Sequence, residues 1–133
     1  MGNFTYFIRE RVQLNGIERG GNYEATINDI KSVDNRVMSI YTGSLTEIVN
    51  LNSFISGSVK YVRVTNTSTG SINLQLSGSS AQLNLRLDAN GSLVFSSEYI
   101  SSTFNNFVYG SLQSIKGSPI DQESVITYFI VTT

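Results

Sequence analysis

Residues 58–97 read SVKYVRVTNTSTGSINLQLSGSSAQLNLRLDANGSLVFSS, and apolar and polar side chains alternate along them almost without error. Successive side chains of a strand point to opposite faces of a sheet, so this alternation puts a leucine-rich face inward and an amide-rich face outward. Clusters of Asn, Asp, Ser and Gly separate the runs, and these residues favour chain reversals. The segment is therefore predicted to be a β-meander with core residues at Leu74, Leu76, Leu83, Leu85 and Leu87.

The same alternation extends toward the N-terminus. Residues 4–14 are predicted to form a long half-buried strand with a bulge near Glu10, and Asn15-Gly16 is a strong hairpin signal. A second reversal is predicted at Gly20-Gly21. Residues 33–36 are predicted to be a turn and residues 37–41 another strand.

Residues 44–55 have two interpretations. Ser44 and Glu47 have the spacing of a helix-capping box, which favours a short helical turn. Ile48 and Val49 are β-branched, which favours a strand. Both interpretations stay open at this point.

The C-terminal part is also predicted to be β-structure. Residues 107–115 have the pattern of a strand, and residues 116–119 are predicted to be a turn that holds the only proline. Residues 124–131 are apolar on both faces, which is typical of a strand in the interior of a sheet or against a neighbouring subunit. Short strands at spacings of about ten residues predict an all-β fold. We expect residues 1–133 to form a single antiparallel β-sandwich or jelly-roll-like domain with a central meander.

The composition excludes several kinds of chemistry. The chain has no cysteine and no histidine, so thiolate zinc sites, cysteine nucleophiles and the commonest general base are absent. Its net charge of −1 does not favour nucleic-acid binding. No signal peptide and no membrane span are predicted. No motif for a phosphate, a cofactor or a serine nucleophile is present, so we expect a protein without cofactors that is not an enzyme.

The sequence offers one segment with metal-ligand character and one group of candidate sugar-binding residues. Residues 88–91 place Asp88 and Asn90 two apart, as calcium loops do, but further carboxylates are missing and a plain turn is favoured. Exposed tyrosines stack on sugar rings, but Tyr also fills sandwich rims and subunit interfaces. The tyrosines in question are Tyr23, Tyr41, Tyr61, Tyr99 and Tyr109. A carbohydrate-binding module or adhesin is therefore the alternative function.

Residues 61–76 (YVRVTNTSTGSINLQL) and residues 85–95 (LRLDANGSLVF) resemble small structural proteins of tailed bacteriophages. The resemblance is in a strand that ends in TN, a polar turn, an alternating strand and a return through Leu-Asp and Gly-Ser. It implies a head-decoration (cement) protein or a fibre or spike module that works as an oligomer and has no catalytic residues. The implied location is the virion, assembled in the host cytoplasm.

The surface predicted to contact a partner lies near the two termini. Only six charged residues follow Val64, and interface cores are poor in charge and rich in aromatic residues. We therefore expect contacts with other virion subunits (capsid or tail and fibre proteins) or with further copies of the chain. The expected contact residues are Phe4, Tyr6, Phe7, Tyr99, Phe104, Phe107, Tyr128, Phe129 and Ile130.

Overall fold

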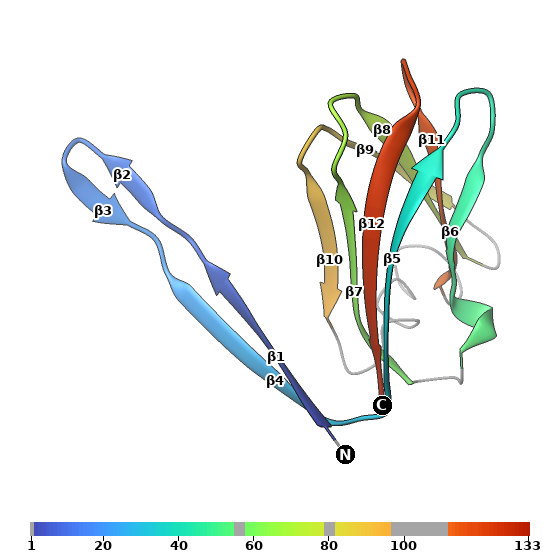
Figure 1. The fold of residues 1–133 in the computed structure, drawn as a ribbon. Coiled ribbons are helices and arrows are strands. Elements are labelled where there is room, and N and C mark those ends of the chain that lie inside the picture. The colour runs from blue at the N-terminus through green and yellow to red at the C-terminus, as the bar shows by residue number, and fades with distance from the viewer. Residues whose placement is uncertain (1, 55–57, 79–81, 97–111) are drawn as a thin grey trace.

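The computed structural model describes residues 2–54, 58–78, 82–96 and 112–133, and these residues are almost entirely β-structure. Within them, eight strands form two four-stranded antiparallel sheets that pack on each other as a β-sandwich (Figure 1). The first sheet has the order β10 (Ser92–Ser96), β7 (Val59–Asn66), β12 (Ser124–Thr132) and β5 (Ser32–Ile40). The second has the order β6 (Thr46–Asn50), β11 (Leu112–Pro119), β8 (Ile72–Gly78) and β9 (Gln82–Leu87). The predicted all-β sandwich is confirmed.

The strand pairing is that of a jelly roll. Strand β5 pairs with β12, β6 with β11, β7 with β10 and β8 with β9, so each pair is nested inside the one before it. A long hairpin that is rolled over two sheets produces this nesting. The predicted central meander is wrong, because β8 and β9 form a hairpin in the second sheet while β7 and β10 pair in the first, so β7 and β8 are not neighbours.

The core lies between the two sheets and consists of aliphatic side chains with one tyrosine. Leu74, Leu76 and Leu87 are buried, as predicted from their alternation, while Leu83 and Leu85 are half-buried against the same core. The apolar faces of β7 and β12 contribute Val62, Val64, Ile126, Tyr128 and Ile130. The predicted interior position of the last strand is confirmed, because β12 lies between β7 and β5.

The N-terminal residues form a hairpin arm that extends from one end of the sandwich (Figure 1). Strand β1 (Gly2–Arg9) pairs with β4 (Asn22–Ile30), and β2 (Val12–Leu14) pairs with β3 (Ile17–Arg19). The tip turn at Asn15-Gly16 is confirmed, since both residues have positive φ values, 54° and 77°, as a two-residue hairpin turn requires. We call residues 2–30 the arm.

The arm corrects two predictions. Residues 4–14 are not one half-buried strand, because they are interrupted at Glu10 and are largely exposed. Gly20-Gly21 is not a reversal: the chain continues along the arm, and the Glu10 N–H donates to the Gly21 carbonyl at 2.8 Å. Gly20 is required there, since a Cβ would lie 2.1 Å from the Glu10 carbonyl oxygen.

Two other predicted turns are strands in the structure. Residues 33–36 belong to β5 and residues 116–119 belong to β11. At Gly117 the strand passes so close to the core that a Cβ would lie 2.9 Å from the Ile48 side chain. Glycine therefore serves close packing here and not a reversal.

Residues 44–55 contain both of the predicted alternatives in succession. They form β6 and then the short 3-10 helix η1 (Leu51–Ser53). The cap of η1 is the Asn50 side chain, which accepts a hydrogen bond from the Asn52 N–H at 3.0 Å. The predicted capping box at Ser44 does not form, and the Ser44 hydroxyl donates to the Tyr41 carbonyl instead.

Candidate interaction surface

An aromatic cluster joins the base of the arm to the outer face of the first sheet. The Phe4 ring lies 4.9 Å from the Tyr61 ring and 5.5 Å from the Phe129 ring, between ring centroids. The Tyr6 ring lies 5.0 Å from that of Tyr61, and its hydroxyl donates to Ser96 Oγ at 2.7 Å. Tilted contacts at such distances are favourable for aromatic rings, so the base of the arm is bound to the sandwich.

The cluster also changes the environment of two polar groups. Burial raises the pKa of the Tyr61 hydroxyl, and the nearby Arg63 guanidinium acts in the opposite direction. The Arg63 guanidinium lies 5.4 Å from the centre of the Phe129 ring, within the range of a cation–π contact. The outer face of the sheet is therefore an apolar surface with one cation stacked on it.

The arm is amphipathic along its whole length. Its register pairs Phe4 with Ile27, Tyr6 with Ala25 and Ile8 with Tyr23, so these side chains share one face. The opposite face is polar except at Phe7. Both strands of the arm are interrupted at the same level, one at Glu10 and Arg11 and the other at Gly20 and Gly21. The pairing register of the two strands is therefore the same before and after the interruption.

The apolar face of the arm extends further than the sandwich that it contacts. Phe4 and Tyr6 are half-buried, but the next pair, Ile8 and Tyr23, is 44% and 57% exposed. At the tip, Val12, Leu14 and Ile17 are each more than half exposed. We call the exposed apolar residues Ile8, Val12, Leu14, Ile17 and Tyr23 the distal arm face.

The outer face of the first sheet likewise continues beyond the base of the arm. The register places Val94, Arg63, Phe129 and Asn35 in one row across the sheet. The next row includes Val37, which is 70% exposed. Val94 is 42% exposed. We call Val37, Arg63, Val94 and Phe129 the open sheet face.

The predicted contact residues have different positions. Phe4, Tyr6 and Phe129 meet in the aromatic cluster, while Phe7 lies on the opposite face of the arm and is 71% exposed. Tyr128 and Ile130 must be corrected as contact residues of the folded chain: they face the core between the sheets and are 5% and 1% exposed. Tyr99, Phe104 and Phe107 lie outside the described residues.

Sequence reasoning missed the residues of the distal arm face and Val37. The alternation of residues 4–14 was visible, but it indicates only that one face is apolar and not what covers that face. The sequence signal for a long two-stranded arm is the hairpin turn at Asn15-Gly16. Pairing the chain on either side of that turn aligns Phe4 with Ile27, as the structure shows.

A hollow of sugar size lies between the arm and the sandwich. It has a volume of about 420 Å³ and is lined by Tyr6, Tyr23, Asn28, Lys60 and Ser96, among others. The rings of Tyr6 and Tyr23 lie 6.2 Å apart. Of the other tyrosines considered for sugar binding, Tyr41 is 59% exposed, whereas Tyr61 is covered by the aromatic cluster.

A cluster of polar side chains, formed by Asp34, Arg36 and Tyr128, lies on the core side of the edge strand β5. Arg36 Nε donates to Asp34 Oδ1 at 3.1 Å, and the Tyr128 hydroxyl donates to Asp34 Oδ2 at 3.2 Å. Burial and the neighbouring Asp34 raise the pKa of the Tyr128 hydroxyl. These residues line a hollow of about 180 Å³ that also includes Asn50. Inward-facing charges on an edge strand disfavour the addition of a further strand at that edge.

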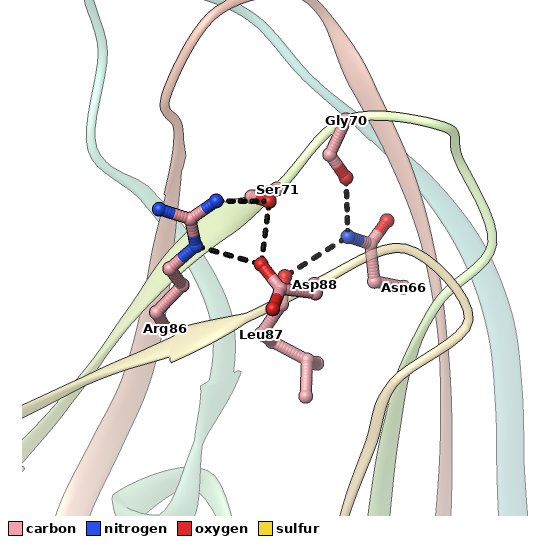
Figure 2. A network of polar contacts seen from close by, with 6 residues as sticks. All are labelled: Asn66, Gly70, Ser71, Arg86, Leu87 and Asp88. Atoms are coloured by element: carbon pink, nitrogen blue, oxygen red, sulfur yellow. Dashed lines mark hydrogen bonds and ion pairs between the residues drawn. The ribbon is translucent and has the colours of Figure 1, made fainter.

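The Asp88 turn is held by protein groups (Figure 2). Asp88 Oδ1 accepts hydrogen bonds from Ser71 Oγ at 2.7 Å and from Arg86 Nε at 2.6 Å. The hydrogen bond from Ser71 and the charge of Arg86 lower the pKa of the Asp88 carboxyl. These contacts support the plain turn over the calcium loop. Among the described residues, no group of three or more His, Cys, Asp or Glu side chains could hold a metal ion.

No protein-family model matches the chain, and no curated protein matches it. Among solved structures, the chain is similar to the cupin domain of CENP-C from Drosophila melanogaster, with a TM-score of 0.37 and 10% sequence identity. The similarity covers 90% of this chain and 73% of that chain. At this TM-score the similarity carries no argument, and the jelly-roll assignment rests on the strand pairing. In the described part of the chain, no helix has the length and apolar character needed to cross a membrane.

Proposed function

We propose that the chain is a non-enzymatic structural subunit of a virus particle, a bacteriophage capsid-decoration (cement) protein or another virion assembly subunit, that acts through protein–protein contacts. The observation that carries the proposal is the amphipathic arm, whose exposed distal arm face extends beyond its own sandwich. Exposed apolar surface of this kind is typical of protein–protein interaction sites. In the assembly, the arm would bind neighbouring subunits while the jelly roll serves as the rigid body.

Two further observations support the proposal. Jelly rolls occur in viral capsid proteins, although lectins and cupins also have this architecture. The assignment to bacteriophage particles rests on the resemblance of residues 61–95 to tailed-phage structural proteins. Assembly of such particles takes place in the host cytoplasm and ends in the virion.

The test measures binding to purified capsids or fibres that lack the chain. The intact chain should cosediment with the particles, and Leu14→Asp combined with Ile17→Asp should greatly reduce the bound amount, since two charges would then lie on the distal arm face. Gln13→Asp is the matched control, because Gln13 lies on the opposite face of the same hairpin tip and is exposed. Equal binding of all three proteins would show that the arm is not the contact.

Carbohydrate binding is the second candidate, and the hollow beside Tyr6 and Tyr23 is the observation that favours it. Aromatic rings with nearby amide and ammonium groups are suited to the apolar faces and hydroxyls of a sugar. A glycan array tests this candidate with the intact chain and with Tyr23→Ala. Binding of a defined glycan at micromolar concentration that is lost in Tyr23→Ala, without binding to any virion component, would replace the assembly proposal.

A further inference from the structure

The chain carries both halves of a contact that it does not complete within one molecule. The base of the arm shows that an apolar hairpin face packs well on the outer face of the first sheet, through Phe4 and Tyr6 on Tyr61 and Phe129. The distal arm face continues the apolar face of the hairpin, and the open sheet face continues the outer face of the first sheet. In the part of the chain that the structure describes, the distal arm face is exposed, and so are Val37 and Val94 of the open sheet face, whereas Arg63 and Phe129 are half-buried.

The distal arm needs cover for a physical reason. An isolated two-stranded hairpin is marginally stable in water, and it becomes stable when its apolar face packs on another element. At the tip, β2 and β3 form a pair of only three residues each, and all six of these residues are exposed. The tip is therefore the part of the arm that depends most on a binding partner.

The sandwich to which the arm is attached does not provide this cover. Toward β2 and β3 the arm diverges from its own sandwich (Figure 1). The unchanged register across the interruption at Glu10 and Gly21 keeps the arm extended and does not fold it back. The described residues of the sandwich therefore leave the distal arm face free for another molecule.

The contact is expected on the face of the sheet and not at its edge. Strand β5 is an edge strand that carries the ion pair of Asp34 and Arg36, and charged side chains on an edge strand disfavour strand addition there. On the outer face, Arg63 separates the exposed Val94 from Phe129, and the exposed Val37 lies one row further along, beside Thr127. Phe129 itself already binds the base of the arm. The open sheet face is thus continuous with a surface that is known to accept this hairpin.

We propose that the distal arm face of one copy of the chain binds the open sheet face of a second copy. The inference deepens the proposed assembly function, on which it rests, by naming the partner of the arm as the chain itself. Such a contact joins two different patches, so it generates a reciprocal pair, a closed ring or an open filament of copies, depending on whether its rotation closes. The side chains that meet are Leu14, Ile17 and Val12 of the arm and Val37 and Val94 of the sheet.

The oligomeric mass of the full chain, measured by light scattering at several concentrations, tests the inference. The wild-type chain should form oligomers at micromolar concentration, and Leu14→Asp and Val37→Asp should each shift it to the monomer. Gln13→Asp on the polar face of the tip and Asn84→Asp on β9 should leave the mass unchanged, since both residues are exposed outside the two surfaces. Because Val37 belongs to the sandwich, its variant leaves the arm sequence intact.

Site-specific cross-linking identifies the two surfaces directly, because the chain has no cysteine of its own. Ile17→Cys and Val37→Cys are purified separately, mixed and treated with a short bismaleimide. A cross-linked product that contains one copy of each variant is expected. Products only between two Ile17→Cys copies would overturn the inference in favour of arm-to-arm contact, and a wild-type chain that is monomeric at every concentration would overturn it entirely.

The two proposals fail in different ways. A monomeric chain that binds capsids or fibres through its arm would retain the assembly function and remove the second copy as partner. A chain that forms the oligomer but binds no virion component would retain the inference and remove the assembly function.

Discussion

Asn66 shows how one polar side chain can join two turns at the end of the jelly roll. It is fully buried, and its Nδ2 group donates to the carbonyls of Gly70 and Leu87 at 2.7 and 3.1 Å (Figure 2). Its Oδ1 accepts hydrogen bonds from the Ser68 N–H and hydroxyl. The burial of an asparagine is stable only when its polar atoms have hydrogen-bond partners. Here these hydrogen bonds hold the loops after β7 and β9 in place.

Asn66→Ala should lower the free energy of unfolding by about 2–3 kcal/mol, because it leaves buried carbonyl and N–H groups without partners. Urea unfolding followed by fluorescence measures this change. The control is Asn73→Ala on β8, since Asn73 is exposed and its loss should change stability by less than about 0.5 kcal/mol. Equal effects of the two substitutions would contradict the structural role of Asn66.

Asp88 gives the chain an acid-sensitive contact. Its carboxyl has a lowered pKa in the folded chain, because it accepts hydrogen bonds from Ser71 and Arg86. A lowered folded pKa means that the stabilisation is complete above the unfolded pKa of about 3.9 and is lost as the pH falls through the folded value. Asp88→Asn should therefore be less stable than the wild type at neutral pH, and the difference should shrink as the pH falls below about 3.9 and vanish below the folded pKa.

Urea midpoints of both proteins across this pH range measure the difference. Glu123→Gln, which removes one negative charge from an exposed turn, is the control for net charge. A difference between Asp88→Asn and wild type that stays constant down to the lowest pH would contradict the assignment.

At the scale of the elements, the arm and the sandwich have different relations to the core. All the buried core residues of the described chain lie in residues 40–130, and none lies in β1 to β4. The jelly roll therefore encloses its core without the arm. The arm adds an aromatic contact on the outer face, where it covers Tyr61.

A variant that starts at residue 31 should still fold into the jelly roll. It loses the cover over Tyr61, which is worth about 1–3 kcal/mol, but it retains the eight strands that enclose the core. Circular dichroism should show a β-spectrum with a cooperative thermal transition at a lower temperature than that of the full chain. A variant without a cooperative transition would show that the arm is needed for folding.

At the scale of the whole molecule, the fold separates a rigid body from a projecting contact element. Four nested strand pairs bring residues from opposite ends of the sandwich sequence together, as in the pairing of β5 with β12. The arm enters this body directly through Lys31, whose N–H donates to the Thr132 carbonyl at 2.9 Å. The arm is thus joined to β5 and β12, at one edge of the first sheet.

If copies associate through their arms, the melting temperature of the full chain should rise with protein concentration. Association of folded copies stabilises the folded state by mass action, because the unfolded chain does not bind. Differential scanning calorimetry over a wide concentration range measures the rise, and Leu14→Asp should abolish it. A melting temperature that is independent of concentration in both proteins would argue against association.

Local residue patterns were sufficient for the β-structure, the polar turns at Asn15-Gly16 and Asp88, and the buried positions of Leu74 and Leu76. These features depend on side-chain alternation and on turn chemistry, which act between residues close in the chain. Only the tertiary structure decided that β7 pairs with β10 across the jelly roll, because strand partners far apart in the chain share no local signal. It also decided that the apolar face of β1 lies outside the sandwich: alternation shows that a face is apolar, but the element that covers it is determined by packing.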